Sequence, residues 1–327
     1  MATEYLFAAD LGSTSISAAI VSSAGAILAR KSEPLDSSSA DASVAQLVRL
    51  ANELSKKTGR RVRSAGVAVG VAAQAGGKAA TPVFDEAELQ AKLARALRLP
   101  AVVDSDRAAA VLGETWKGSA PGAQDVVVLL VGHNVLAGVM IAGHVLRGAH
   151  RLAGAAGWMA VSEADGFEVR KFGGLEAFAS GPGIVRAAKN AIEAGFGGSL
   201  ADYDSSLFTA EDIAELARRG DVTARQIYRR SGKQLGLAVA NLVSLFDPAV
   251  VVVTGGLTGA SDLFWADLLE TATARAHPGA ARQVQICLSK LHGDAVLLGA
   301  ARLACELRSV AAKRPPIRRK RRAASRG

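Results

Sequence analysis

The chain opens with short apolar runs that are separated by turns of small polar residues. Apolar residues dominate 5–9 and 16–21, on either side of Asp10-Leu-Gly-Ser-Thr14, and a third apolar run follows at 26–30. Runs of this length between such turns are typical of consecutive antiparallel strands. The pattern predicts a β-hairpin that opens a meander.

The next part of the chain alternates between helical and strand-like patterns. Apolar positions at helical spacing predict helices over 42–59, 86–97 and 108–116. The apolar runs between these helices, 65–71 and 101–103, predict buried strands.

The same order of elements then restarts. Apolar strands are predicted at 125–131 and 137–142, around the turn Gly132-His-Asn134. The later elements are helices over 176–194, 209–220 and 222–245, a strand at 250–253, a helix that begins near Ser261, a strand at 284–288 and a helix over 295–308. Two successive halves of this kind predict an α/β protein with duplicated lobes and a cleft between them.

We expect the lobes to divide the chain near residue 118. The N-terminal lobe is predicted over residues 1–118, completed by a C-terminal helix at 290–310, and the C-terminal lobe over 119–289. Residues 311–327 are expected to form a disordered basic tail, because a Pro-Pro pair is followed by a run of Lys and Arg.

Charge is concentrated in that tail. The formal net charge is +9, and eight cations without any acid lie from Lys313 onward, so the preceding residues carry about +1. Affinity for nucleic acid or acidic surfaces is therefore expected in the tail, as a non-specific and salt-sensitive binding. The alternative is a solubilising end without a partner.

Composition excludes several classes of protein. With 50% hydrophobic residues the chain does not stay disordered over most of its length. Two cysteines, Cys287 and Cys305, are too few for a disulfide scaffold and predict buried thiols of a reducing compartment. Polar residues interrupt every long apolar stretch, so no membrane-spanning helix is predicted. The opening residues lack the pattern of a signal peptide, and a cytoplasmic location is expected.

The turn at 10–14 has the residue types of a phosphate-binding loop. Glycine and small hydroxyl residues let backbone N–H groups approach a phosphate, and Thr14 can donate a hydrogen bond. Asp10 can hold a hydrated Mg²⁺, which keeps several waters and few protein ligands. The alternative is an ordinary hairpin turn, because Asp-x-Gly is frequent in turns.

Two further turns suggest a ligand site and also have simpler explanations. Asp104-Ser-Asp106 lies between a strand and a helix, where a carboxylate can accept a proton from a substrate hydroxyl or cap the helix. Gly255 and Gly256 follow an apolar strand, where they allow close approach of a ligand or simply form a turn.

Taken in order, these segments resemble the ROK family (repressors, open reading frames, kinases) of the actin-like ATPase fold. The resemblance covers about residues 5–308. It rests on Asp10-Leu-Gly-Ser-Thr14, Leu99-Pro-Ala-Val-Val-Asp-Ser-Asp106, Leu112-Gly-Glu114, the segment from Gly173 to Pro182, the segment from Asn241 to Pro248, Val251-Val-Val-Thr-Gly-Gly256 and the segment from Gly293 to Ala301.

The resemblance implies two actin-like (ribonuclease H-like) lobes and, in active members, a sugar kinase that depends on ATP and Mg²⁺. Other members are sugar-responsive repressors. It implies that the nucleotide is bound by Asp10, Gly12, Ser13, Thr14, Gly132, Gly255 and Gly256. It also implies that Asp106 is the catalytic base and that Ser105, Asp106 and Glu176 contact the sugar. A homodimer is plausible from the family.

The chain also departs from the family pattern. Leu136 and Ala137 replace small residues of the second phosphate loop, and Ala155 and Trp158 replace the sugar-binding glutamate and a zinc-ligating histidine. The cysteines of the zinc motif are replaced by Phe167, Val169 and Gly174, so no zinc is expected. A helix-turn-helix ahead of Asp10 is not expected, since nine residues precede it.

These departures lead to two functional hypotheses. The first is a catalytically impaired relative that binds a nucleotide or small ligand as a sensor or regulator. The alternative is an active ATP-dependent sugar kinase with Asp106 as its base, acting on an unusual sugar or polyol.

Overall fold

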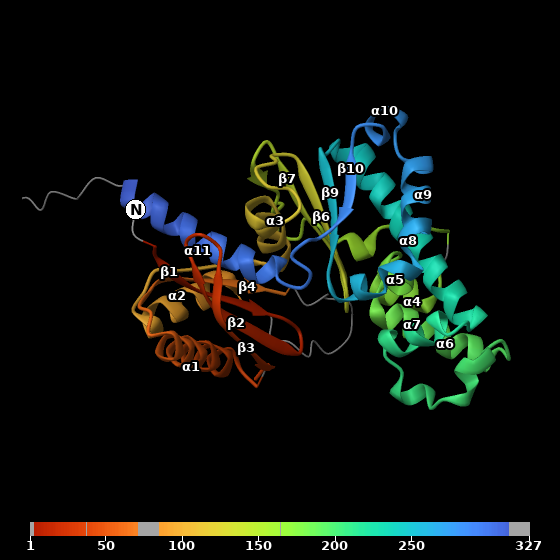
Figure 1. Ribbon diagram of the computed structural model, residues 1–327, viewed down its shortest axis with the longest axis horizontal. Coiled ribbons are helices and arrows are strands. Elements are labelled where there is room, and N and C mark those ends of the chain that lie inside the picture. Colours follow the sequence, from red (N-terminus) through yellow and green to blue (C-terminus); the bar gives the residue numbers. More distant parts are fainter. Residues whose placement is uncertain (1–2, 37, 71–84, 164, 314–327) are drawn as a thin grey trace, which may run out of the picture.

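Two five-stranded sheets organise the chain, whose computed structural model is drawn in Figure 1. The structure describes residues 3–36, 38–70, 85–163 and 165–313. The first sheet has the order β3-β2-β1-β4-β5 and consists of β1 (Tyr5–Leu11), β2 (Ser15–Ser22), β3 (Ile27–Pro34), β4 (Val62–Val69) and β5 (Ala101–Ser105). The second has the order β10-β9-β6-β7-β8 and consists of β6 (Val126–Val131), β7 (Val135–Ile141), β8 (His144–Val145), β9 (Val250–Thr254) and β10 (Gln285–Leu288).

The two sheets are built on the same plan. Each begins with an antiparallel hairpin, β1–β2 or β6–β7, and the first strand of the hairpin pairs in parallel with a later strand, β4 or β9. This repetition confirms the predicted α/β fold with two duplicated lobes. The boundary near residue 118 stays a prediction, and the predicted tail lies, from residue 314, outside the described residues.

The helices fill the space around and between the sheets. They are α1 (Ala40–Thr58), α2 (Glu86–Leu97), α3 (Asp106–Lys117), α4 (Phe167–Phe172), α5 (Glu176–Ala179), α6 (Gly181–Glu193), α7 (Ala210–Arg218), α8 (Val222–Phe246), α9 (Trp265–Arg275), α10 (Pro278–Ala281) and α11 (Ala295–Lys313). Short 3-10 helices are η1 (Ala156–Trp158), η2 (Gly198–Asp202), η3 (Ser205–Leu207) and η4 (Gly256–Leu263). None of the described helices is long and apolar enough to cross a membrane.

The first sheet buries one face under α1 and α2. Leu47, Leu50 and Leu54 recur along one side of α1 and are fully buried, in the same apolar cluster as Phe7 and Ile20 of the sheet. Burying each of these leucines contributes about 1.5–3 kcal/mol. We call this sheet, with α1, α2 and α11, the N-terminal lobe, and the second sheet with α4–α10 the C-terminal lobe.

Helices α3 and α11 lie between the two sheets and share one core with both (Figure 1). That core joins Leu6 of β1 to Val128 of β6 through the alanines of α3 and α11. The two helices approach closely, because a Cβ added at Gly299 would lie 1.7 Å from the Ala109 carbonyl oxygen and one at Gly113 would lie 2.1 Å from that of Ala295. The backbones touch, so both positions require glycine.

Two elements differ from the sequence-based expectation. The single helix expected over 176–194 is broken at Ser180, whose side chain caps α6 by accepting a hydrogen bond from the Gly183 N–H, with Pro182 in the first turn. After Gly255, the chain forms η4 before α9 begins at Trp265. Cys287 and Cys305 are half-buried, not fully buried, and form no disulfide.

The close contact between α3 and α11 generates a stability prediction. Replacing Gly299 with alanine improves helix propensity by about 1 kcal/mol, but the methyl group collides with the Ala109 carbonyl. We expect Gly299→Ala to lower the free energy of unfolding by about 3 kcal/mol, because backbone overlap cannot be relieved by a rotamer change. Urea denaturation measures this.

Gly293→Ala is the matched control, since nothing lies within 4 Å of a Cβ at that glycine. It should change the free energy of unfolding by less than about 0.5 kcal/mol. Equal stability of the two variants would contradict the close helix contact.

Candidate functional site

Three neighbouring parallel strands bring two carboxylates together. Strand β4 lies between β1 and β5, and all three run in the same direction, so their carboxyl ends meet at one edge. Asp10 is near the end of β1, Gly70 follows β4, and Asp106 begins α3 directly after β5. Ligands of α/β proteins bind at this edge of the sheet.

A cavity of about 210 Å³ opens at this edge and reaches the C-terminal lobe. Asp10, Gly70 and Asp106 line it on the N-terminal side. The complete lining is Asp10, Gly12, Ser13, Gly70, Asp106, Leu130, Val131, Gly132, Asn134, Leu136, Gly255 and Val296. The cavity thus lies between the lobes, against the turns of both hairpins.

Where glycines line the cavity, its wall consists of backbone atoms and not of side chains. Gly255 has φ +105°, and a Cβ there would lie 2.5 Å from the Val131 carbonyl oxygen, so only glycine fits. A Cβ at Gly70 would point to the Asp106 Oδ2 at 3.6 Å and would narrow the crevice. Leu136, in contrast, places an apolar side chain in the lining.

Burial changes the ionisation of both carboxylates. Burial and the charge of Asp106 raise the pKa of Asp10 to about 7. Burial also raises the pKa of Asp106 to about 6, against the lowering effect of the charge and the backbone N–H of Arg107. Two acids that face one crevice disfavour each other's charged form. Asp106 remains largely ionised at neutral pH and can accept a proton.

The Asp106 carboxylate is oriented by the residue that follows it. Its Oδ1 accepts a hydrogen bond from the Arg107 N–H at 2.7 Å, and the Arg107 Nε lies 3.9 Å from the same oxygen. The Arg107 side chain is almost fully buried and donates from Nη2 to the Arg151 carbonyl oxygen at 3.0 Å. Oδ2 therefore remains the oxygen on the Gly70 side.

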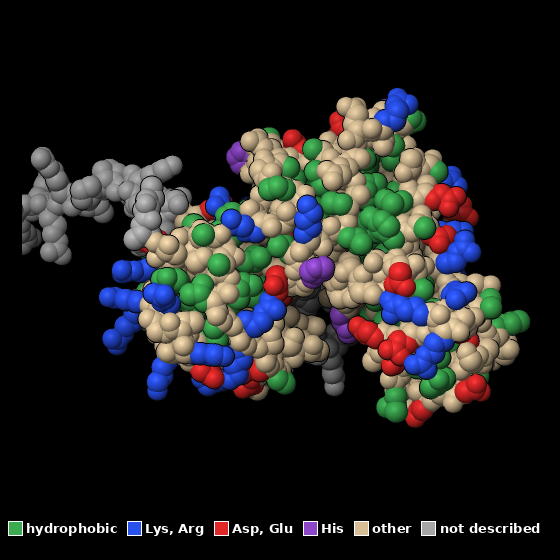
Figure 2. Space-filling model, viewed as in Figure 1, with side chains coloured by type: hydrophobic (Ala, Val, Ile, Leu, Met, Phe, Trp, Pro, Cys, Tyr) green, Lys and Arg blue, Asp and Glu red, His purple; other side chains and the backbone are tan. Residues whose placement is uncertain are grey.

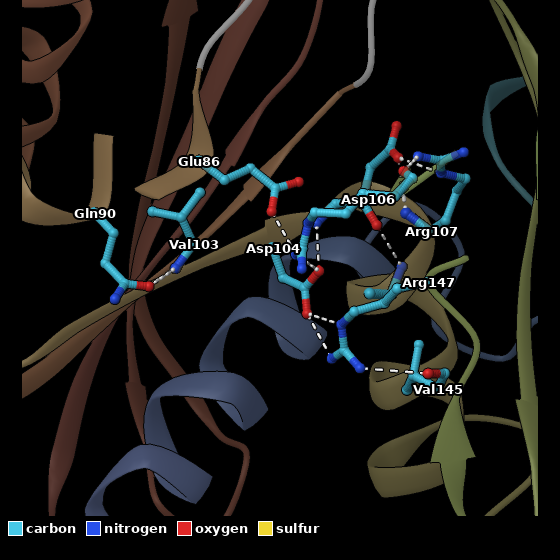
Figure 3. A network of polar contacts seen from close by, with 11 residues as sticks. Glu86, Gln90, Val103, Asp104, Asp106, Arg107, Val145 and Arg147 are labelled. Atoms are coloured by element: carbon cyan, nitrogen blue, oxygen red, sulfur yellow. Dashed lines mark hydrogen bonds and ion pairs between the residues drawn. The ribbon is translucent and has the colours of Figure 1, made fainter. Parts of the chain in front are cut away.

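A third carboxylate, that of Asp104, is also buried and joins the two lobes. Asp104 Oδ2 accepts two hydrogen bonds from Arg147, at 2.9 and 2.6 Å from Nε and Nη2, and Figure 3 shows this guanidinium directed at the carboxylate. Asp104 Oδ1 accepts from Arg151 at 3.0 Å, and Arg151 also pairs with Glu86 of α2. The loop after β8 is thereby fixed to β5 and α2.

Most of the predicted site residues meet at the cavity. Asp10, Gly12, Ser13, Asp106, Gly132 and Gly255 line it. Thr14 and Gly256 are not in the lining, and the Thr14 side chain is exposed. Ser105 acts as the N-cap of α3 by accepting a hydrogen bond from the Ala108 N–H at 3.2 Å, as the capping alternative predicts.

Glu176 is also absent from the lining. Its Oε2 accepts a hydrogen bond from the Val135 N–H at 3.0 Å, and this oxygen would lie 2.7 Å from a Cβ at Gly157. Burial raises the pKa of Glu176, opposed by the Val135 N–H and by Arg186. The carboxyl group thus connects the start of β7 to η1, the segment that contains Trp158.

Several residues of the site carried no signal that the sequence analysis used. Gly70 could have been found, because it lies near the end of the strand predicted over 65–71, between the segments that contain Asp10 and Asp106. Asn134 belongs to the turn already noted at Gly132, and Leu136, already noted as a departure from the family pattern, lies at the start of β7. Arg147 had no sequence signal, since its partner Asp104 is 43 residues away.

No group of three or more His, Cys, Asp or Glu side chains that could hold a metal ion occurs in the described ranges. The Asp10–Asp106 pair nevertheless suits a hydrated divalent cation, because a positive charge would stabilise the ionised form of Asp10 against burial and against the charge of Asp106, which together raise its pKa. The fit is to an ion held by one carboxylate and water.

The Asp104 network generates a prediction for stability. Asp104→Asn removes the charge that two arginines share, and we expect it to lower the free energy of unfolding by about 2 kcal/mol in urea denaturation. The cost stays below that of a fully buried pair because both arginines are partly solvated. Glu215→Gln, which removes an exposed partner of Arg219, is the control and should cost less than about 0.5 kcal/mol. An Asp104 variant as stable as this control would mean that the network does not hold the loop.

Comparison with known proteins places the chain in a family. The profile of the ROK family matches residues 6–306. A glucokinase of Halalkalibacterium halodurans is 28% identical over 313 residues, which are 91% of this chain and 94% of that protein. The crystal structure of a ROK family glucokinase from Streptomyces griseus, in complex with glucose and AMPPNP, has a TM-score of 0.76 at 27% identity and covers 92% of this chain and 99% of its own.

A ROK family transcriptional regulator described as a homolog of the Escherichia coli Mlc protein shares the fold, with a TM-score of 0.78 at 23% identity over 93% of this chain and 78% of its own. These neighbours have the two-lobe actin-like fold. The chain, with its duplicated sheets and its crevice between two hairpin turns, belongs to the ROK family.

Proposed function

We propose that the protein is an ATP-dependent sugar kinase. The observation that carries the proposal is the convergence of Asp10, Gly70 and Asp106 at one edge of the N-terminal lobe, opposite Gly132 and Gly255 of the C-terminal lobe. This crevice offers backbone surfaces to phosphates and a base to a hydroxyl group.

The similarity to glucokinases supports the hypothesis of an active kinase. One of the neighbouring structures holds glucose and AMPPNP, and the glucokinase of Halalkalibacterium halodurans matches over almost its whole length. The first hypothesis, a catalytically impaired sensor, receives no comparable support. We therefore prefer the alternative, in which Asp106 is the base.

The reaction follows from the placement of these groups. The nucleotide phosphates lie against the turns at Gly12, Gly132 and Gly255, and the sugar hydroxyl approaches Asp106 Oδ2. The hydroxyl oxygen bonds to the γ-phosphorus, the bond from that phosphorus to the β–γ bridging oxygen breaks, and ADP departs with the bridging oxygen. The hydroxyl proton passes to Asp106. In such a transfer the protein chiefly positions the reactants and stabilises charge.

Asp10 would hold Mg²⁺ through water, and the ion would neutralise charge that develops on the phosphate oxygens. The ion would also stabilise the ionised form of Asp10, which burial in the crevice otherwise disfavours.

The sugar is expected to differ from the hexoses of typical relatives. Ala155 and Trp158 stand where the resemblance places a glutamate and a histidine, so hydrogen bonds that orient a hexose are missing. The Trp158 side chain of η1, with 45% exposure, offers an apolar face instead. We propose a sugar or polyol with fewer hydroxyl contacts. The homodimer, the cytoplasmic location and nucleic-acid binding by the tail stay predictions.

Replacing the base tests the proposal directly. We expect Asp106→Asn to lower kcat by about 10²–10⁴-fold, because the general base is lost while the shape of the side chain is kept. A coupled assay of ADP release over hexoses, pentoses and polyols measures this. Asp202→Asn, which changes an exposed aspartate of η2, is the control and should leave kcat unchanged.

Binding of AMPPNP with Mg²⁺, followed by isothermal titration calorimetry, separates the two hypotheses. The kinase proposal requires both nucleotide binding and turnover that disappears in the Asp106 variant. Nucleotide binding without turnover on any sugar would favour the sensor, and absence of nucleotide binding would refute both.

The pH dependence of turnover provides a further prediction. Asp106 must be ionised to accept a proton, and its pKa is about 6. With nucleotide and Mg²⁺ saturating, so that the cation keeps Asp10 ionised, we expect kcat/KM for the sugar to fall as the pH drops through about 6 and to level off above it. A pH–rate profile with the best sugar measures this. If kcat/KM fell only near pH 4, the pKa of an exposed carboxyl group, the result would contradict a buried base at position 106.

A further inference from the structure

Exposed cations gather at the end of the N-terminal lobe that lies opposite the crevice. Five occur in the eight residues from 56 to 63, and two more lie near the end of α2. We call this set the cationic edge: Lys56, Lys57, Arg60, Arg61, Arg63, Arg95 and Arg98. All seven side chains are exposed.

The sheet topology explains why two distant segments meet there. Strands β4 and β5 are parallel neighbours, so the segments that precede them reach the same edge of the sheet. The Ala65 N–H donates to the Pro100 carbonyl oxygen at 2.9 Å and fixes this contact. Figure 2 shows Lys and Arg side chains projecting from the end of the lobe farthest from the C-terminal lobe.

The charge of the cationic edge is not compensated by acids. None of its members forms an ion pair within the described part of the chain, whereas other cations of the lobe do. Lys92, for example, pairs with Asp41 and Glu88. The near-neutral net charge of residues 1–312 thus conceals a strongly positive region outside the tail.

Helix α11 ends near the same edge. The Ser64 hydroxyl donates to the Ala304 carbonyl oxygen at 3.0 Å, and Gly66 lies against the carbonyl of Ala300. The helix therefore runs antiparallel to β4 and ends at the cationic edge. Eight further cations follow in the sequence from Lys313 onward.

We infer that the cationic edge is a binding surface for the phosphate backbone of nucleic acid. Five of its seven cations are arginines, whose planar guanidinium groups bind phosphate through paired hydrogen bonds. None of the exposed large apolar side chains of the described residues lies in segments 56–63 or 95–98, and membrane-surface binding would use such side chains. Contacts to phosphates alone give affinity without sequence preference.

This surface is separate from the kinase crevice. The cationic edge lies at the amino ends of the strands and the crevice at their carboxyl ends, and the seven residues of β1 span roughly 20 Å between them. The inference stands beside the proposed function, and neither depends on the other.

A charge-matched pair of variants of the full chain tests the inference. The first combines Lys57→Gln, Arg61→Gln and Arg63→Gln. The control combines Lys233→Gln, Arg275→Gln and Arg282→Gln, exposed cations of the C-terminal lobe that lose the same charge. Fluorescence anisotropy with a labelled duplex DNA of arbitrary sequence, over a series of salt concentrations, gives affinity and salt dependence. Thermal unfolding and nucleotide binding verify that both variants are folded.

We expect the first variant to bind the duplex at least roughly tenfold more weakly at 0.1 M salt, with the slope of log K against log salt reduced by about 2–3, because each phosphate contact contributes about 0.9 to that slope. The control should bind as the unchanged chain does. Equal binding of the two variants would overturn the inference. Tighter binding to vesicles containing phosphatidylserine than to the duplex, lost in the same variant, would also overturn it and assign the edge to a membrane surface.

Discussion

The contact between α3 and α11 is the constraint on which the rest of the structure depends. The two helices lie between the sheets, and glycine at positions 113 and 299 lets their backbones touch. One apolar core, from Leu6 of the first sheet to Val128 of the second, is thereby continuous across both lobes. Both helices also begin at the crevice, since Asp106 of α3 and Val296 of α11 line the cavity.

Three carboxyl groups are buried in the crevice or beside it, although burial disfavours their charged forms. Two carboxylates line the crevice, and burial raises the pKa of both, with the charge of Asp106 adding to the rise for Asp10. Beside them Asp104 is buried as well, but Arg147 and Arg151 compensate its charge and tie the lobes together. Asp10 and Asp106, whose pKa values stay raised, lie where a cation and a hydroxyl group can use them, and Asp104, which two arginines bind, has a structural role.

Much of the fold could be predicted from the sequence, because apolar periodicity reports local structure and the order of elements restricts topology. The placement of Asp10 and Asp106 in one site came from the family resemblance, and the parallel pairing of β1, β4 and β5 gives its physical reason. The sequence could not indicate which distant residue each polar side chain contacts. Glu176 turns its carboxylate to Val135, and Arg147 reaches Asp104 across the lobe boundary. Ser180 interrupts a helix that periodicity alone makes continuous, because its cap competes with the helical pattern.

The cationic edge and the acids of the crevice lie at opposite ends of the direction in which β1 runs. Unpaired cations stand beyond the amino end of this strand and two acids at its carboxyl end, so these groups contribute an electric dipole along the strand direction. A molecule polarised in this way turns its strand amino ends toward any negatively charged surface before contact. The mouth of the crevice then points to the solvent, where small molecules can still enter.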